Sequence, residues 1–260
     1  MTSRLSEKTK AFIVLGTFLL VVFINFLANR LPINNLTTGE VSDQFPVHFT
    51  PAGYVFIIWG LIYLLLAIFS VYQALPNQYE RPVFKRIRWW LAAANIWNIL
   101  WIFSWHYLQI SLSLFFMILL LLSILFIYVS VEQAGVKQKK QEFITVFLPF
   151  SIYLGWACVA AIANLSILAL HLGWIGEGMG SAVWSVVMII LGALIAVLVI
   201  MTRRDIAFAL VFAWAFIGIG ARHGADALGV TIVAWLSAAV ILVLLGGSIA
   251  GGEKVFSAKK

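Results

Sequence analysis

Charge is what this sequence has least of. Only 10% of its 260 residues are charged, whereas 63% are hydrophobic, and the mean hydropathy is +1.04. An ordinary soluble domain carries about 25% charged residues, which it uses to cover its surface. The composition therefore argues against a soluble enzyme, a disordered chain and a nucleic-acid-binding module, and it favours a membrane protein.

Cysteine and buried charge are also scarce. Cys158 is the single cysteine, which excludes an intramolecular disulfide and a multi-cysteine metal cluster. The middles of the apolar runs hold no acidic or basic residue, whereas ion-coupled carriers keep ionisable groups there. The sequence shows no Ser-His-Asp or paired-carboxylate pattern. We therefore expect no enzyme, and we assign no catalytic residue, no metal ligand and no required cofactor.

Long apolar runs make up most of the sequence. A bilayer is spanned by about 20 apolar residues, and continuous runs of that kind are typical of helices rather than of the alternating strands of a membrane β-barrel. The predicted fold class is all-α, a polytopic membrane helix bundle with about eight transmembrane helices. The expected spans are 11–28, 51–75, 89–108, 110–131, 143–164, 181–201, 206–222 and 230–249.

The basic residues orient these spans. With the N-terminus in the cytoplasm, all of the 17 Lys and Arg residues except Arg30 and Arg222 fall on the cytoplasmic side. This asymmetry predicts a multi-pass protein of the cell membrane with both termini cytoplasmic. The net charge of +7 is then a consequence of topology, and it indicates lipid headgroups rather than nucleic acid as the partner.

Aromatic and amide side chains recur at helical spacing in three of the spans. Such a stripe is on its own more often packing than a site, because residues three and four apart share a helix face. Three stripes together suggest a shared cavity with aromatic walls. They consist of Phe56, Trp59 and Tyr63 in the second span, Asn98, Trp101 and Trp105 in the third, and Trp156, Ala160 and Asn164 in the fifth.

These motifs resemble the tryptophan-rich sensory proteins, also called the TspO, translocator-protein or peripheral benzodiazepine receptor family. The resemblance covers about residues 11–165. Where that family has Pro-Pro-Gly-Trp-Val-Phe before a Trp and a Tyr, this chain has Pro51-Ala52-Gly53-Tyr54-Val55-Phe56 before Trp59 and Tyr63. Met117 stands near the position of an acidic residue in the family's fourth helix.

The resemblance implies a five-helix bundle with a pocket near the first loop. Ligands of the family are porphyrins, sterols and benzodiazepine-type drugs. Carried over residue by residue, it places Trp59, Tyr63, Asn98, Trp101, Trp156 and Ala160 on the pocket wall, and the three stripes add Phe56, Trp105 and Asn164 to the predicted ligand-binding set.

The expected organisation follows from the resemblance and the charges. A cytoplasmic tail, 1–10, precedes the TspO-like bundle, 11–165. An extracytoplasmic loop, 166–180, leads to a three-helix C-terminal extension, 181–250, and to a cytoplasmic tail, 251–260. In the extension, Gly192 with Ala196 and Gly220 with Gly224 form small-xxx-small pairs that favour close helix packing.

We therefore expect a receptor-like membrane protein that binds a planar hydrophobic ligand, a tetrapyrrole (porphyrin or haem) or a sterol-like molecule. Two alternatives stay open: a transporter of such a molecule, and a light-dependent porphyrin-degrading enzyme. The expected partners are the lipid bilayer and the small ligand, with no nucleic acid, and a homodimer also stays open.

The sequence contains four histidines. His48, His106, His171 and His223 all fall at the predicted extracytoplasmic ends of the spans. Gathered together, they could bind a metal or a haem iron. The more ordinary expectation is that each serves a polar interface and that the four never meet.

Overall fold

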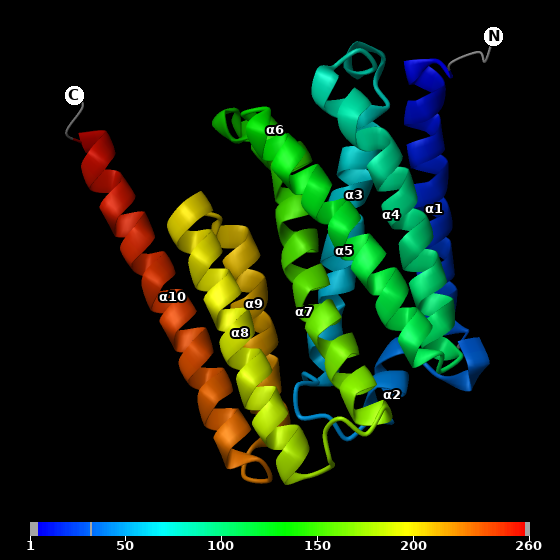
Figure 1. Ribbon diagram of the computed structural model, residues 1–260. Coiled ribbons are helices and arrows are strands. Elements are labelled where there is room, and N and C mark those ends of the chain that lie inside the picture. The colour runs from blue at the N-terminus through cyan, green and yellow to red at the C-terminus, as the bar shows by residue number, and fades with distance from the viewer. Residues whose placement is uncertain (1–4, 32, 258–260) are drawn as a thin grey trace. The chain divides into compact units, whose positions relative to one another are not determined.

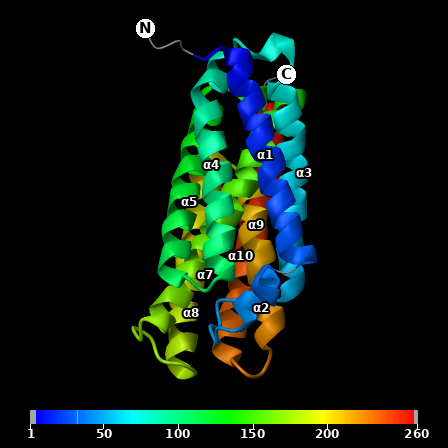
Figure 2. The ribbon, with the colours of Figure 1, turned by 90° about the vertical axis from the view of Figure 1, so that its right-hand side faces the viewer.

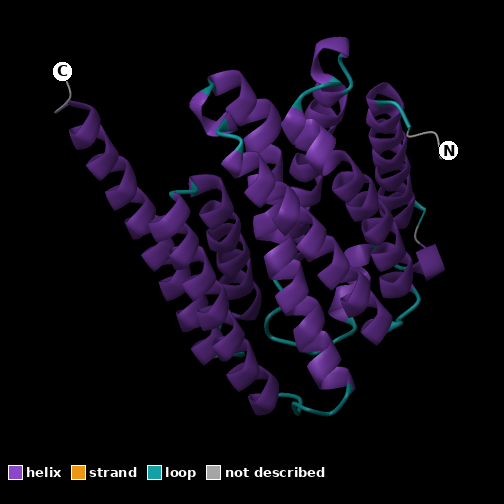
Figure 3. Ribbon diagram, turned by 45° about the horizontal axis from the view of Figure 1, so that its top comes forward, coloured by secondary structure: helices purple, strands orange, loops and turns teal. Residues whose placement is uncertain are grey.

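The computed structural model describes residues 5–31 and 33–257. Within these residues the chain is helical, with loops and turns but no strand, as Figure 3 shows. The predicted all-α helical bundle is thereby confirmed. Of the basic residues used for the orientation, Arg4, Lys259 and Lys260 lie outside the described residues.

Eight long helices follow the expected order of the apolar runs. Some extend past the predicted ends, whereas the second begins only at Ile58, after a 3-10 turn over Gly53–Ile57. Between them lie the short helices α2 (Thr38–Asp43) and α6 (Lys140–Glu142). The long ones are α1 (Glu7–Arg30), α3 (Ile58–Gln73), α4 (Pro82–His106), α5 (Ile110–Gln133), α7 (Leu148–His171), α8 (Met179–Arg203), α9 (Ile206–His223) and α10 (Leu228–Ser257).

Seven of these segments are long and apolar enough to cross a bilayer. The helix outside this group is α4, which is 25 residues long but contains several Trp, two Asn and a terminal His that lower its mean hydropathy. Large apolar side chains cover the outer faces, for example Leu19, Phe23 and Phe26 on α1. Such faces are suited to contact with lipid tails. Together with the number of apolar helices, they show that the chain is a multi-pass membrane protein.

The chain divides into two compact units. The first comprises residues 1–44 and 57–157, and the second comprises 45–56 and 158–260. In the first unit, α4 packs against both α1 and α5, and Figure 2 shows these three helices side by side. The helix α1 also packs against α3.

A π-helical turn, Phe143–Phe147, leads into α7. Pro149 has no N–H with which to bond the Thr145 carbonyl, and the turn just before it widens so that Leu148 N–H donates to the Phe143 carbonyl. Pro149 therefore distorts the start of the helix in the form of a π turn. The helix then continues to His171, into the segment 166–180 that the sequence analysis treated as loop.

The second unit contains α8, α9 and α10, which pack against one another as a three-helix group (Figure 1). Glycines allow close approach at two places. A Cβ at Gly192 would lie 3.0 Å from Phe216 Cζ of α9, and one at Gly220 would lie 2.7 Å from Trp235 Nε1 of α10. Gly224 instead ends α9 with a φ of 49°, which favours glycine.

The second unit also includes the segment Phe45–Phe56, which lies against α9. The Ala52 N–H donates to the Gly218 carbonyl at 3.1 Å, and Arg222 Nη1 donates to the Pro51 carbonyl at 3.2 Å. Trp214 Nε1 donates to the Val55 carbonyl at 3.2 Å. Three polar contacts to backbone therefore hold this segment, called the 45–56 segment below, on one face of α9.

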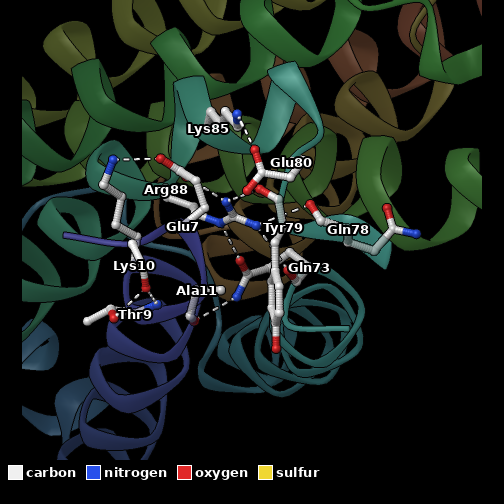
Figure 4. A network of polar contacts seen from close by, with 11 residues as sticks. Glu7, Thr9, Lys10, Ala11, Gln73, Gln78, Tyr79, Glu80, Lys85 and Arg88 are labelled. Atoms are coloured by element: carbon white, nitrogen blue, oxygen red, sulfur yellow. Dashed lines mark hydrogen bonds and ion pairs between the residues drawn. The ribbon is translucent and has the colours of Figure 1, made fainter. Parts of the chain in front are cut away.

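A buried arginine anchors the first unit at the start of α4. Arg88 is 1% exposed, and its guanidinium donates to Glu7 Oε2 at 2.9 Å, to Gln73 Oε1 at 3.0 Å and to the Tyr79 carbonyl at 2.7 Å (Figure 4). These contacts join α1, the end of α3 and α4. The charge asymmetry led us to expect Arg88, like the other cytoplasmic cations, to face lipid headgroups. The structure corrects this expectation, because the charge of Arg88 is buried and paired with Glu7.

Candidate ligand-binding site

Trp59 is the centre of an aromatic cluster in the first unit. Its ring stacks on Tyr63 of the same helix, with centroids 5.6 Å apart, and lies 5.9 Å from the ring of Trp101 on α4. Two residues of α7, Tyr153 and Trp156, form T-shaped pairs with it, with centroids 6.0 Å and 6.2 Å away. These separations are those of favourable aromatic pairs. The cluster therefore joins α3, α4 and α7 around a single indole.

A chain of polar groups runs beside the rings. Asn25 Nδ2 of α1 donates to Asn98 Oδ1 of α4 at 2.8 Å, and Asn98 Nδ2 donates to the Tyr153 hydroxyl at 3.3 Å. Asn98 is fully buried. The Tyr63 hydroxyl is buried beside the Asn98 amide without meeting the geometry of a hydrogen bond. An amide inside an apolar helix must find a partner, and Asn98 finds partners on two other helices.

The end of α4 extends the cluster toward α2. Trp105 stacks on Trp101 with centroids 6.2 Å apart, and its Nε1 donates to the Thr38 carbonyl at 3.1 Å. His106 Nε2 lies 3.2 Å from Thr38 Oγ1, and its Nδ1 lies 3.0 Å from the Ile33 carbonyl. These contacts fix the segment after α1 against the end of α4.

The aromatic rings of the cluster differ in how much of each is exposed. Trp101, Trp105 and Trp156 are buried, whereas Trp59 and Tyr63 are only partly covered. The buried rings form a wall, and Trp59 and Tyr63 are the partly exposed members of the cluster. The chemistry offered is a flat apolar stacking surface next to a few hydrogen-bonding groups, as is typical of sites for flat, largely apolar molecules.

The predicted site residues divide between the two units. The structure brings together Trp59, Tyr63, Asn98, Trp101, Trp105 and Trp156 in the first unit. Phe56, Ala160 and Asn164 belong to the second unit, where Asn164 Nδ2 donates to the Ala160 carbonyl at 2.9 Å. Their part in ligand binding stays a prediction from the resemblance.

Two members of the cluster were missed by the sequence analysis. Tyr153 lies three residues before Trp156, on the same helix face, and Asn25 is the amide inside the first apolar run. Both had a signal in the sequence: a buried amide needs a partner, and a tyrosine one turn from a tryptophan continues its stripe.

Replacing Asn98 by leucine is expected to lower the free energy of unfolding by about 1–2 kcal/mol, because it leaves Asn25 and Tyr153 without their shared partner. Thermal unfolding in detergent measures this loss. The double replacement of Asn25 and Asn98 by leucine should lose less than the sum of the two single losses. Additive losses would contradict the polar chain described above.

The histidines do not gather as a group of four. His106 has its partners within the first unit, as described above, and His171 is exposed at the end of α7. In the second unit, His48 and His223 lie with ring centroids 5.0 Å apart. Burial lowers the pKa of His48, which favours the neutral form of its ring. Among the described residues, no group of three or more His, Cys, Asp or Glu is placed to hold a metal ion.

The second unit also has an apolar hollow of about 290 Å³ between the start of α8 and the start of α10. It contains no aromatic side chain and none of the predicted site residues. Its lining is Ala182, Val183, Val186, Val187, Ala227, Leu228, Gly229 and Val230. Such a surface can accept an alkyl chain but offers no stacking partner for a planar ring.

Comparison with known proteins agrees with the motifs. A family model described as TSPO-like protein matches residues 11–247. The match extends beyond the region 11–165 that carries the resemblance and takes in the three C-terminal helices as well. Comparisons with curated proteins and with solved structures found no match.

Proposed function

The chain belongs to the TSPO-like protein family, and on that premise we propose that it is a receptor-like membrane protein that binds a planar hydrophobic ligand. A tetrapyrrole, either a porphyrin or haem, is the first choice, and a sterol-like molecule is the second. The membrane is the cell membrane, with both termini on the cytoplasmic side.

The observation that carries this proposal is the partly exposed ring of Trp59 within a wall of buried aromatic rings. A flat macrocycle gains both apolar burial and aromatic stacking on such a ring. Trp101 and Trp156 hold the indole in place, so little side-chain freedom is lost on binding. The same wall offers less to a flexible alkyl chain, which favours a rigid planar ligand.

Polar groups of the wall would orient the ligand. The buried Tyr63 hydroxyl is a donor without a hydrogen bond in the described structure, and Asn98 lies beside it. A ligand carbonyl or carboxylate that reached this hydroxyl would satisfy it. We assign stacking to Trp59 and orientation to Tyr63 and Asn98.

The test is a protoporphyrin IX titration of the detergent-purified full chain in the dark, followed by the shift of the porphyrin absorption band. Saturation at one porphyrin per chain is the expected result. A signal that rises linearly with porphyrin, as in empty micelles, would contradict the proposal.

Two further measurements distinguish the receptor from its alternatives. Uptake of porphyrin into sealed vesicles that contain the protein would favour a transporter. Loss of the bound porphyrin under light, with breakdown products, would favour the degrading enzyme. Saturable binding without uptake or breakdown supports the receptor.

A further inference from the structure

Two histidines that are far apart in the sequence lie side by side in the second unit. His48 belongs to the 45–56 segment, and His223 is the last residue of α9. Their ring centroids are 5.0 Å apart and their planes are tilted by 48°. Both residues are partly exposed.

The hydrogen bonds of Ser181 fix the tautomer of His48. Ser181 Oγ donates its one hydrogen to the Pro46 carbonyl at 3.1 Å. The same oxygen must therefore accept from His48, whose backbone N–H lies at 3.2 Å and whose Nδ1 lies at 3.0 Å. With the hydrogen on Nδ1, the neutral ring carries its lone pair on Nε2. Metal-binding histidines are commonly oriented in this way, by a hydrogen bond from the ring nitrogen that does not bind the metal.

The ring of His223 has a buried nitrogen without a well-formed hydrogen bond. His223 Nε2 is buried without meeting the geometry of a hydrogen bond, although the backbone of His48 and of Thr50 lies beside the ring. A buried polar atom left unpaired lowers stability. An ion that accepted the lone pair of this nitrogen would remove that loss.

The spacing of the rings matches two ligands of one ion. A zinc–nitrogen bond of about 2.0–2.1 Å places an imidazole centroid about 3.2 Å from the metal. Two such rings at a tetrahedral angle have centroids about 5.2 Å apart, whereas rings on opposite sides of a haem iron have centroids about 6.4 Å apart. The observed 5.0 Å fits adjacent ligands of one ion and does not fit axial ligation of haem.

We propose that His48 and His223 form a two-histidine site for a late first-row divalent metal ion such as Zn²⁺. Imidazole suits these metals. Water or an external ligand fills the remaining positions, because no third His, Cys, Asp or Glu joins the pair among the described residues. The neighbouring cation, Arg222, donates to the Pro51 carbonyl. Ser181 is a positioning residue that acts through His48.

Zn²⁺ alone is the probe for this site, and porphyrin plays no part in the test. The full chain, purified without a histidine tag and stripped of metal, is titrated with Zn²⁺ by calorimetry at pH 7.5. One Zn²⁺ per chain is expected. His48→Ala and His223→Ala should each weaken binding at least about tenfold, and Ser181→Ala should weaken it about tenfold through the lost orientation of His48.

His171→Ala is the matched control, because it removes an exposed histidine outside the pair and should leave the affinity unchanged. The unfolding temperature of each variant verifies that it is folded, and glutamine replaces alanine where it is not. Equal Zn²⁺ binding by the wild type and the variant lacking both His48 and His223 would overturn the proposal, as would no binding by the wild type.

A second readout identifies the ligands directly. Cu²⁺ at one equivalent should show an electron paramagnetic resonance spectrum with coupling to two imidazole nitrogens, and His223→Ala should reduce it to one. A spectrum without imidazole coupling in the wild type would contradict the site.

Discussion

Replacing Arg88 by alanine is expected to lower the free energy of unfolding by about 3–5 kcal/mol, because it removes one partner of a buried ion pair. Glu7 would lose its 2.9 Å partner, and Gln73 Oε1 and the Tyr79 carbonyl would lose their donor (Figure 4). Arg88→Lys should recover only part of the loss, since an ammonium cannot reach all of these acceptors at once. Unfolding by SDS in mixed micelles measures the change.

Arg86→Ala is the matched control for this prediction. It removes an arginine of the same helix whose contact with Gln133 is exposed, so the expected loss is below about 1 kcal/mol. Losses of equal size for the two arginines would mean that the Arg88 guanidinium is hydrated in the native protein. The anchoring of α1, α3 and α4 would then have to come from apolar packing alone.

Gly218→Ala should destabilise the second unit by about 1–3 kcal/mol, although alanine is the better helix former. The added Cβ would overlap Val55 Cγ2 and would lie 3.3 Å from Pro51 Cβ. The 45–56 segment would have to move away from α9, and its 3.1 Å hydrogen bond from Ala52 to Gly218 would break. Hydrogen exchange of the segment measures its release from α9.

Gly246→Ala serves as the control for the glycine. It lies in α10, where an added Cβ meets no atom within 4 Å, so the gain in helix propensity should leave stability unchanged or slightly higher. If Gly218→Ala behaved in the same way, the close contact between α9 and the 45–56 segment would not exist in solution.

The helices were predictable from the sequence because each apolar run is continuous and long. The number of the runs and the charges between them gave the order of the eight long helices. The small-residue pairs also predicted close packing, and Gly192 and Gly220 do approach aromatic rings of neighbouring helices. Local patterns of this kind require no knowledge of which helices are neighbours.

Features that depend on distant contacts were harder to predict. The apolar run 89–108 left Arg88 in the preceding loop, and only the fold shows that it belongs to α4 and that Glu7 and Gln73 surround it. In the same way, nothing near Gly218 in the sequence indicates that Val55 lies against it. The pairing of His48 with His223 also joins two segments whose proximity only the fold determines.

The aromatic cluster falls between these cases. Each stripe was visible from its spacing, and the structure places the members on α3, α4 and the first part of α7 around Trp59. Asn25 belongs to no aromatic stripe, because α1 contributes an amide rather than a ring to the cluster. The need to pair every amide in hydrocarbon is the physical rule that would have found it.

Porphyrin affinity in a variant of Trp59 shows whether a planar ligand stacks on this residue. Trp59→Leu keeps an apolar side chain but removes the indole, so protoporphyrin IX should bind about tenfold more weakly. Trp174→Leu removes a tryptophan that is 68% exposed outside the cluster and should bind as the wild type does. Equal affinities in the wild type and Trp59→Leu would contradict the claim and place the ligand elsewhere.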